Sequence, residues 1–465
     1  MEYINKRNLI LPLRYHVPDG EAHVMPDGKL YVYGSYDALD MAYCSQEYHV
    51  VSTEDMEHWT VHDVAFKAQD VPWMGDPEAE HYPGIDWYHP TPFLQKMIDA
   101  MPKEAKTEAV EVQCTDAGER KQELLFAPDC ICRGGKYYLY FCLSDDSEGV
   151  AVSDRPEGPF KDPVQLPCGG IDPAVFIDDD GQAYYYWGQV FAHGAKLNDD
   201  MVSIDRDSVV DDIVTEEKHC FHEGSSMRKI GDTYYYVYAD MERGKPTSLG
   251  YATGKNPLGP FTYRGIIIDN DGCDPQSWNN HGSIECVEGQ WYVFYHRCSR
   301  GTQQHRRLCV EKLTVNPDGS IDEVKMTSQG IGEPFAPGEK IMGYQACALK
   351  GNCYIDVDND HGYEEKLTNM RDGDEAVFRY VKSETSWKRI ELTCFGNGTA
   401  VVFLNGEKAG EVSISGEKGN VHMVSAPITM DAGEYELMLR FEKPEGMELL
   451  EVRLFSCVKG DSSYE

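Results

Sequence analysis

The 465-residue sequence is poor in basic residues. Its 43 lysines and arginines stand against 79 aspartates and glutamates, which gives a formal net charge of −36. Phosphate backbones and anionic lipid surfaces repel a chain this acidic. The shortage of positive charge therefore argues against a nucleic-acid or membrane partner and suits a protein that takes a neutral ligand.

Long apolar runs and paired cysteine motifs are also missing. No run is long enough to cross a bilayer, and residues 1–7 contain no apolar segment of the secretory kind. The 15 cysteines are scattered without any C-x-x-C pair, and some, such as Cys142 and Cys286, lie in apolar runs. This pattern favours buried free thiols over disulfides or zinc ligands. We expect a cytoplasmic protein, or a secreted one if a leader precedes this sequence.

Short aromatic runs are abundant instead. The chain has 29 tyrosines, many of them paired or tripled inside strand-like runs. In the clearest unit, residues 171–188, an aspartate precedes a short apolar strand, an Asp-Gly turn and an aromatic strand. This is the pattern of a β-hairpin with an acid at its entrance.

Four other stretches have the same arrangement of polar head, short strand, turn and aromatic strand. The five heads begin near residues 19, 127, 171, 223 and 281. Further strands usually follow each hairpin, so that four strands recur about every 50 residues. Five such units predict a five-bladed β-propeller. The alternative is a β-sandwich with accidental self-similarity.

The repeat pattern fades near Gly330. Beyond it, alternating runs such as 376–381 and 435–441 indicate strands separated by turns. We therefore predict an all-β chain: a five-bladed β-propeller over residues 1–335, followed by a β-sandwich (jelly-roll) over residues 340–465.

A long insertion separates the first two repeats, at residues 68–123. It contains several aromatic residues, namely Trp73, Tyr82, Trp87, Tyr88 and His89, which are followed by a helix-like run at residues 92–98. Insertions of this kind usually lie at one face of the ring, so these aromatics could stack on a sugar. The alternative is that they pack the loop itself.

Three heads carry an acid: Asp19, Asp172 and Glu223. Asp19 and Asp172 each stand nine residues before the glycine of their turn, Gly28 and Gly181. In a propeller these heads line the central channel and converge at one face. Like charges at one channel mouth raise the pKa of at least one of these acids. Glycoside hydrolysis needs such a set, because one acid protonates the leaving oxygen and another activates water or attacks the sugar. Taken singly, each acid could instead be a solvated turn carboxylate.

With these heads in order, residues 8–330 resemble glycoside hydrolase family 43. The resemblance rests on Asp19, Ala127-Pro128-Asp129, Asp172-Pro173, Glu223-Gly224 and His281-Gly282. It implies an inverting, exo-acting enzyme that removes α-L-arabinofuranosyl or β-D-xylosyl groups from plant-type oligosaccharides and needs no cofactor for the chemistry. The alternatives are a non-catalytic glycan-binding propeller, or a propeller enzyme acting on fructosides or galactosides.

The same resemblance assigns the acids. It implies that Asp19 is the general base, that Glu223 is the general acid, and that Asp172 tunes and orients the acid. The family usually has proline after the base, where this sequence has Gly20. Glu21 is therefore a second candidate for the base.

Further site residues follow from the resemblance. Arg306 falls where the family often binds substrate, although a surface ion pair is the alternative. Asp129 either touches substrate or caps the structure. Apart from the resemblance, Trp73 of the insertion is a candidate sugar-stacking residue. His281 matches a channel histidine beside a water-coordinated Ca²⁺, so a structural calcium held through waters is a candidate. The alternative for His281 is a hydrogen-bonded residue without metal.

The C-terminal region resembles a family 6 carbohydrate-binding module. The resemblance rests on residues 372–377 and 424–428, but the Glu-x-Glu calcium motif and the usual terminal Asn and Trp are missing. Tyr380 and Trp387 could stack on a sugar or pack the core. We expect a structural accessory.

Overall fold

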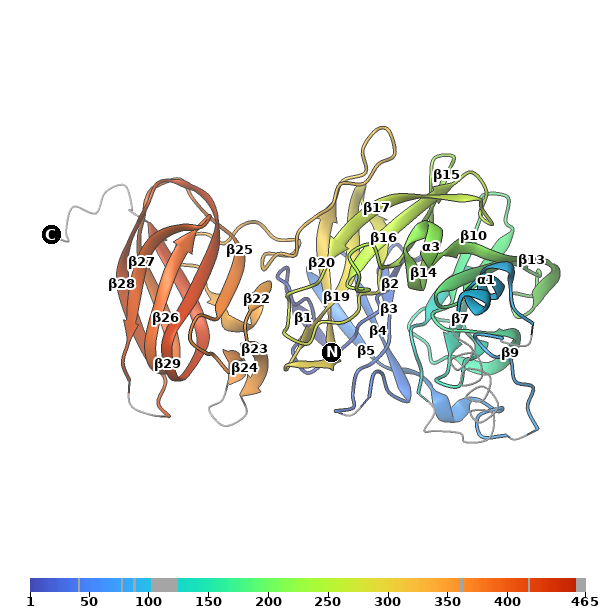
Figure 1. The fold of residues 1–465 in the computed structure, drawn as a ribbon. Coiled ribbons are helices and arrows are strands. Elements are labelled where there is room, and N and C mark those ends of the chain that lie inside the picture. The colour runs from blue at the N-terminus through green and yellow to red at the C-terminus, as the bar shows by residue number, and fades with distance from the viewer. Residues whose placement is uncertain are drawn as a thin grey trace.

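The computed structural model describes residues 1–40, 42–76, 78–86, 89–101, 124–358, 363–416 and 419–456. Figure 1 shows a ring of small sheets, coloured from blue to yellow, and a second body of orange and red strands that leads to the C-terminus. The described helices are few and short, and none is long and apolar enough to span a membrane. The predicted all-β architecture is confirmed.

Five antiparallel sheets form the predicted propeller. Blade 1 contains β1 (Glu2–Ile4), β2 (Glu21–Val24), β3 (Leu30–Tyr33), β4 (Glu47–Thr53) and β5 (His58–Lys67). Blade 2 contains β6 (Asp129–Arg133), β7 (Lys136–Cys142), β8 (Ser147–Ser153) and β9 (Lys161–Gly169). Blade 3 contains β10 (Ala174–Ile177), β11 (Ala183–Trp187), β12 (Phe191–Leu197) and β13 (Ile204–Thr215). Blade 4 contains β14 (Phe221–Ile230), β15 (Thr233–Asp240), β16 (Ser248–Gly254) and β17 (Phe261–Asp269). Blade 5 contains β18 (Ser283–Val287), β19 (Gln290–Ser299) and β20 (Thr302–Leu313).

The innermost strands, β2, β6, β10, β14 and β18, are neighbours around the ring. The second strand of each blade supplies the aromatic residues that pack between sheets. Tyr140 packs on Tyr185 with ring centroids 5.2 Å apart, and Tyr186 packs on Tyr236 at 5.5 Å. All four side chains are fully buried. The tyrosine-rich repeats thus build the contacts that hold neighbouring blades together.

An N-terminal segment joins the last blade to the first. Blade 5 has three strands of its own, and Ile10 N donates to Leu308 O of β20 at 3.2 Å. The side-chain amide of Asn8 accepts from Val310 N at 3.0 Å and donates to Val310 O at 3.2 Å, as a strand backbone would. The same segment leads out of β1, which pairs with β5 of blade 1. This pairing completes the ring.

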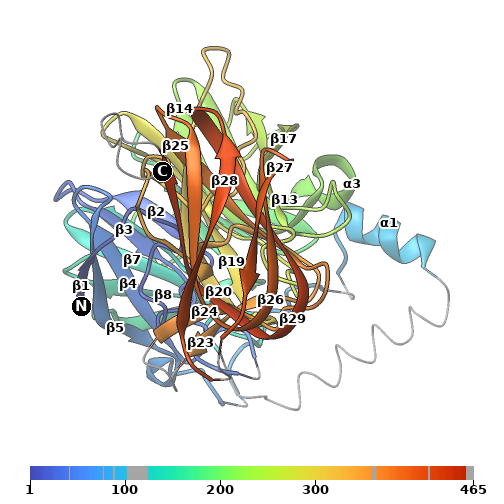
Figure 2. The same ribbon diagram turned by 90° about the vertical axis from the view of Figure 1, so that its left-hand side faces the viewer.

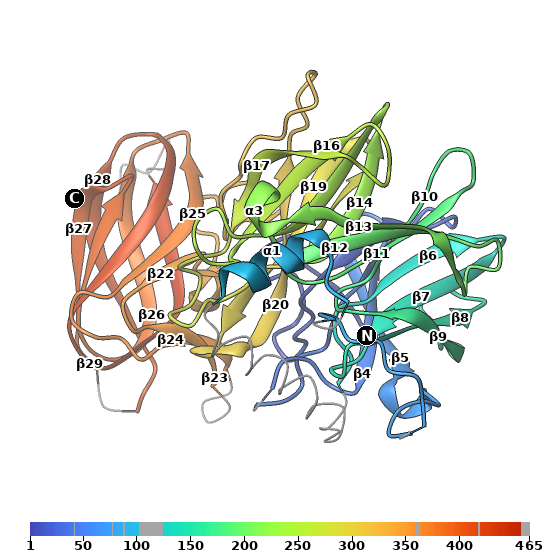
Figure 3. The same cartoon turned by 45° about the vertical axis from the view of Figure 1, so that its right-hand side comes forward.

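The insertion after blade 1 contains η1 (Ala68–Asp70) and α1 (Pro92–Ala100). Pro92 occupies the first turn of α1, and Leu94 N donates to Thr91 Oγ1 at 3.2 Å, which caps the predicted helix. The helix lies against β13 of blade 3, with the short α3 (Glu216–His219) near by (Figure 3). Trp87 and Tyr88 lie outside the described residues.

The C-terminal body is one network of nine antiparallel strands, all of which are shown in orange and red in Figures 1 and 2. It contains β21 (Ile341–Met342), η2 (Gly343–Gln345), β22 (Ala348–Lys350), β23 (Tyr354–Asp358), β24 (Tyr363–Thr368), β25 (Glu375–Ser383), β26 (Trp387–Leu404), β27 (Glu407–Ile414), β28 (His422–Met430) and β29 (Gly433–Ser456). Trp387 is fully buried in its core, so this tryptophan packs the domain and does not face a ligand.

The two bodies are joined by direct contacts. The buried side chains of Arg307 and Glu365 form an ion pair at 2.7 Å. Leu349 N donates to Gly272 O at 2.6 Å, and Arg300 N donates to Ile355 O at 2.7 Å. These contacts dock the C-terminal sheet against the part of the ring formed by blades 4 and 5.

Candidate active site

The strand entrances hold two of the three predicted acids in a distinctive backbone conformation. Asp19 precedes β2 with φ 57°, and Asp172 precedes β10 with φ 55°. Glu223 lies in β14 just before Gly224, which has φ 72°. Non-glycine residues rarely adopt positive φ, and such strained positions gather at functional sites. The equal spacing of Asp19 and Asp172 from their turns therefore reflects an equivalent structure.

The three acids meet around His281. The Nδ1 atom of this buried histidine lies 3.9 Å from Asp19 Oδ1 and 3.7 Å from Asp172 Oδ2. Burial, together with the charges of Glu223 and Asp19, raises the pKa of Asp172 well above its usual value. Acids from blades 1, 3 and 4 thus share one electrostatic environment, as the repeat pattern predicts.

Asp19 is held as a carboxylate. Burial alone would raise its pKa, but Arg306 and a hydrogen bond with His296 outweigh that effect and hold the pKa well below its usual value. Arg306 Nη1 lies 2.8 Å from Asp19 Oδ1, and His296 Nδ1 lies 3.3 Å from the same oxygen. Asp19 is therefore the acid of this group that is ready to accept a proton.

Arg306 reaches the site from β20 of blade 5. Its Nε and Nη2 atoms contact Asp37 Oδ2 and Oδ1 at 2.9 and 3.0 Å, and its guanidinium lies over the Tyr43 ring. Both Arg306 and Asp37 are buried, which excludes the surface ion pair considered as an alternative. With its donors engaged by two carboxylates, Arg306 is placed to hold Asp19 in position.

Glu223 lies between amide donors at the more open side of the group. Gln189 Nε2 donates to Glu223 Oε2 at 2.7 Å, and Asn279 Nδ2 lies 3.5 Å from Oε1. Gln189 comes from the turn that follows β11 of blade 3, so the acid is oriented by a neighbouring blade. Its partly exposed carboxyl group can meet a bound ligand.

Several of these partners were not predicted. Gln189, Asn279, Asp37 and His296 carry no repeat signal of their own. Weak signals existed for two of them. Asn279 belongs to the polar head that contains His281, and His296 interrupts the aromatic strand β19 with a polar residue.

Asp129 and Glu21 belong to another group of polar side chains in the channel, which we call the second polar layer. Asp129 Oδ2 accepts from Val175 N of β10 at 2.7 Å, and Oδ1 accepts from Cys130 N and contacts His23 Nε2. Burial raises its pKa to about 7. Protein donors engage both oxygens, so the structure places Asp129 as a link between blades and favours the structural alternative.

Glu21, the second candidate for the base, belongs to this same layer. Its Oε1 atom lies 2.8 Å from Arg228 Nη2 and accepts from Ser226 Oγ at 3.0 Å. Burial raises its pKa to about 7, although Arg228 opposes that shift. These partners separate Glu21 from the Asp19–Arg306 pair and favour Asp19 as the base.

Trp73 packs the interior. Its side chain is buried, its ring stacks on Phe141 with centroids 6.1 Å apart, and its Nε1 donates to Ser147 Oγ at 3.1 Å. The structure therefore places Trp73 in the core between blades 1 and 2, where a substrate sugar has no access to its face.

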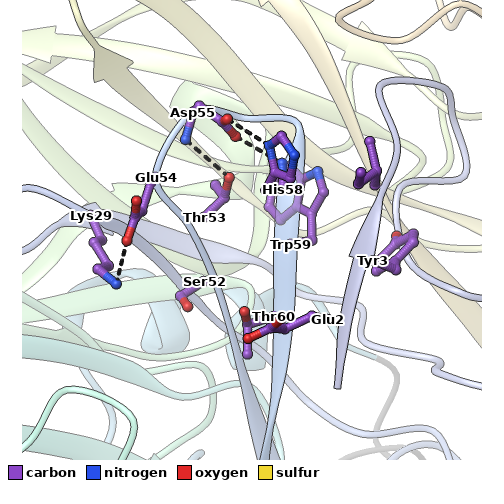
Figure 4. Close-up of a pocket in the computed structure, with 11 residues that line it drawn as sticks. Glu2, Tyr3, Lys29, Ser52, Thr53, Glu54, Asp55, His58, Trp59 and Thr60 are labelled. Atoms are coloured by element: carbon purple, nitrogen blue, oxygen red, sulfur yellow. Dashed lines mark hydrogen bonds and ion pairs between the residues drawn. The ribbon is translucent and has the colours of Figure 1, made fainter.

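Two grooves lie away from this group. One, of about 570 Å³, is formed by β1, β5 and the end of β4, with the Lys29–Glu54 and Asp55–His58 pairs beside it (Figure 4). Another, of about 710 Å³, lies along blade 4 beside Tyr235 and Tyr251. Neither is lined by Asp19, Asp172 or Glu223.

Comparisons with known proteins point to one family. The model of glycosyl hydrolases family 43 matches residues 104–321. A xylosidase/arabinosidase of Bacteroides ovatus is 30% identical over 66% of this chain and 96% of its own length. A xylosidase/arabinosidase of Thermoclostridium stercorarium is 29% identical over 88% of this chain and 90% of its own length.

Solved structures agree with this match. A β-xylosidase/α-arabinofuranosidase from a compost microbial metagenome, in complex with xylotriose and in a calcium-free form, is 29% identical with a TM-score of 0.52. The similarity covers 70% of this chain and 99% of that one. An arabinoxylan arabinofuranohydrolase from Bacillus subtilis, in complex with cellotetraose, is 21% identical with a TM-score of 0.50. It covers 96% of this chain and 97% of its own, so the shared fold extends through the C-terminal body.

Proposed function

This chain belongs to glycoside hydrolase family 43, and from that membership we propose that it is an inverting, exo-acting glycosidase that removes arabinofuranosyl or xylosyl groups from oligosaccharides. The observation that carries the proposal is that two of the three acids at one channel mouth have opposite pKa shifts. Arg306 keeps Asp19 ionised, whereas burial and neighbouring charge favour the protonated form of Asp172. Pairs of acids with opposed pKa shifts are typical of acid–base catalysis.

Asp19 is the general base in this proposal. An inverting enzyme needs a carboxylate that removes a proton from water as the water attacks the anomeric carbon. Arg306 and His296 stabilise the charged form of Asp19, and its buried position limits competing solvent.

Glu223 is the general acid. It lies on β14, on a different blade from Asp19, and it must protonate the oxygen of the leaving group. Asp172 lies near Glu223, and burial together with the charges of Glu223 and Asp19 raises the pKa of Asp172 well above its usual value. Glu223 donates its proton to the leaving group, and the hydrogen bond from Gln189 fixes the direction of its carboxyl group.

The substrate class follows from the relatives. Two of them are named xylosidase/arabinosidase, and one solved relative holds xylotriose. We therefore expect activity on α-L-arabinofuranosides, β-D-xylosides or both. Initial rates on the p-nitrophenyl derivatives of the two sugars, beside a glucoside and a galactoside, would identify the preferred sugar.

Stereochemistry tests the inverting assignment. Inversion needs room for a water molecule between base and sugar, which corresponds to roughly 6.5–9.5 Å between the two carboxyl groups. The proton NMR spectrum of fresh product should show the anomer opposite to that of the substrate. Release of the retained anomer would contradict the roles given to Asp19 and Glu223.

The roles themselves are separated by leaving-group chemistry. Glu223→Ala should lose activity on natural oligosaccharides but keep it on a dinitrophenyl glycoside, whose leaving group needs no proton. Asp19→Ala should fail on both substrates and recover partly with azide. Glu21→Gln is the matched control and should remain active. If Asp19→Ala stays active while Glu21→Gln does not, the base has been misassigned.

A further inference from the structure

Five charged or titratable side chains gather in the second polar layer at the centre of the ring. They come from four of the five innermost strands: Glu21 and His23 from β2, Asp129 from β6, Arg228 from β14 and Glu285 from β18. One ligand atom from each of Glu21, His23 and Asp129 lies within 4.8 Å of the other two. Their spacing alone would suit a divalent metal ion.

The chemistry of these groups does not suit calcium. Calcium takes six to eight oxygen ligands, whereas one of the three groups is an imidazole. Asp129 already accepts hydrogen bonds from Val175 N and Cys130 N. The other candidate position for calcium is beside His281. The acids next to this histidine are Asp19, which is paired with Arg306, and Asp172.

A cation is nevertheless present in this layer, because Arg228 lies inside it. Its Nη2 is 2.8 Å from Glu21 Oε1, and its Nε is 3.1 Å from Glu285 Oε2. Its remaining donors contact Met227 O and Ala22 O. One buried guanidinium therefore links strands of blades 1, 4 and 5.

We propose that Arg228 is the built-in cation of this propeller and holds its centre in place of a calcium ion. Buried carboxylates are costly without a partner, and Arg228 supplies that partner to Glu21 and Glu285. Arginine stays charged at all physiological pH values, so the position is permanently occupied. A divalent ion on Glu21 would stand next to this fixed positive charge and be repelled. This inference does not depend on the catalytic roles.

Metal content and thermal stability of the native protein give the first test. The purified protein should contain less than a stoichiometric amount of calcium, and its melting temperature should be the same in EDTA and in millimolar CaCl₂. One bound calcium per chain, or a melting temperature that falls in EDTA, would overturn the proposal.

Substitutions give the second test. Arg228→Met should lower the melting temperature by roughly 5 °C or more, because it leaves Glu21 and Glu285 without a counter-charge. Adding Glu21→Gln should restore part of the loss, since the double variant removes one of the unpaired acids. Arg243→Met is the control. It removes a surface arginine of blade 4 that pairs with Asp269 and Glu323, and it should change the melting temperature little.

The comparison of Arg228→Met with the double variant Arg228→Met/Glu21→Gln decides whether Arg228 acts as the counter-charge. If the Arg228→Met variant melts at the same temperature as the native protein, Arg228 does not act as the counter-charge. The same conclusion holds if the double variant Arg228→Met/Glu21→Gln melts at a lower temperature than Arg228→Met alone. If Arg228→Met does not fold, recovery of folded protein in the double variant supports the proposal, and failure to recover it counts against it.

Discussion

Removing the positive charge of Arg306 should weaken the preference of the proposed base, Asp19, for its ionised form. Arg306→Met alone would also strand the buried Asp37, which pairs with the same guanidinium. The informative protein is therefore the double variant Arg306→Met/Asp37→Asn, in which Asp19 is the carboxylate that loses its partner. The pKa of Asp19 should rise in this variant, because His296 and His281 then remain to oppose the effect of burial.

The size of this effect can be worked out. With charge centres about 4 Å apart and an effective dielectric constant near 20, the Arg306–Asp19 attraction is about 4 kcal/mol. That corresponds to about 3 pKa units. Since His296 and His281 remain, we expect the acid limb of kcat/KM to move up by about 2 to 3 pH units.

The assay should isolate the base. A dinitrophenyl glycoside removes the need for the acid, so the acid limb of its rate profile, followed from pH 2.5 to pH 9, reports on Asp19. Arg243→Met serves again as the surface control. If the acid limb stays in place while KM rises at every pH, Arg306 binds substrate and the reasoning is wrong.

The same pair affects stability. A depressed pKa means that Asp19 contributes stability above its unfolded-state pKa of about 3.9, and that this contribution is lost as pH falls through the folded-state value. The native protein should therefore keep this contribution at neutral pH, and the double variant should lose it. The urea midpoints of the two proteins should differ most near pH 7 and converge in acid.

Three further predictions concern other residues of the site. Asp172→Asn keeps the shape of the protonated side chain but cannot ionise, so any part of the alkaline limb of the rate profile that reports ionisation of Asp172 should disappear. Gln189→Met frees Glu223 from its 2.7 Å hydrogen bond, and kcat should fall more on xylobiose than on a dinitrophenyl xyloside. Trp73→Ala should cost about 3–5 kcal/mol of unfolding free energy, measured with urea, and leave KM unchanged, because the ring packs on Phe141.

The blades and their acids could be predicted because each blade is a local unit. The spacing from Asp19 to Gly28 is repeated from Asp172 to Gly181, and both glycines adopt nearly the same φ, 84° and 85°. A local turn fixes where the acid enters the channel. Sequence therefore indicates the position of an acid wherever the strand, turn and strand are contiguous.

The partners of these acids could not be predicted in the same way. Arg306 and Asp37 are separated by 269 residues and belong to different blades, so no local pattern joins them. Gln189 reaches Glu223 across the boundary between blades 3 and 4. For Trp73, composition alone does not distinguish an aromatic ring that packs a core from one that faces a sugar.

The N-terminal segment that completes the ring has a consequence for synthesis on the ribosome. Asn8 and its partner Val310 are 302 residues apart, so at about 5–20 residues per second the segment waits roughly 15 to 60 seconds for its partner. During that time the earlier blades can form, but the gap between the first and last blades stays open. We expect the nascent chain to expose the apolar face of blade 1 that packs against blade 5 until β20 emerges, and this interval is when chaperone binding would matter most.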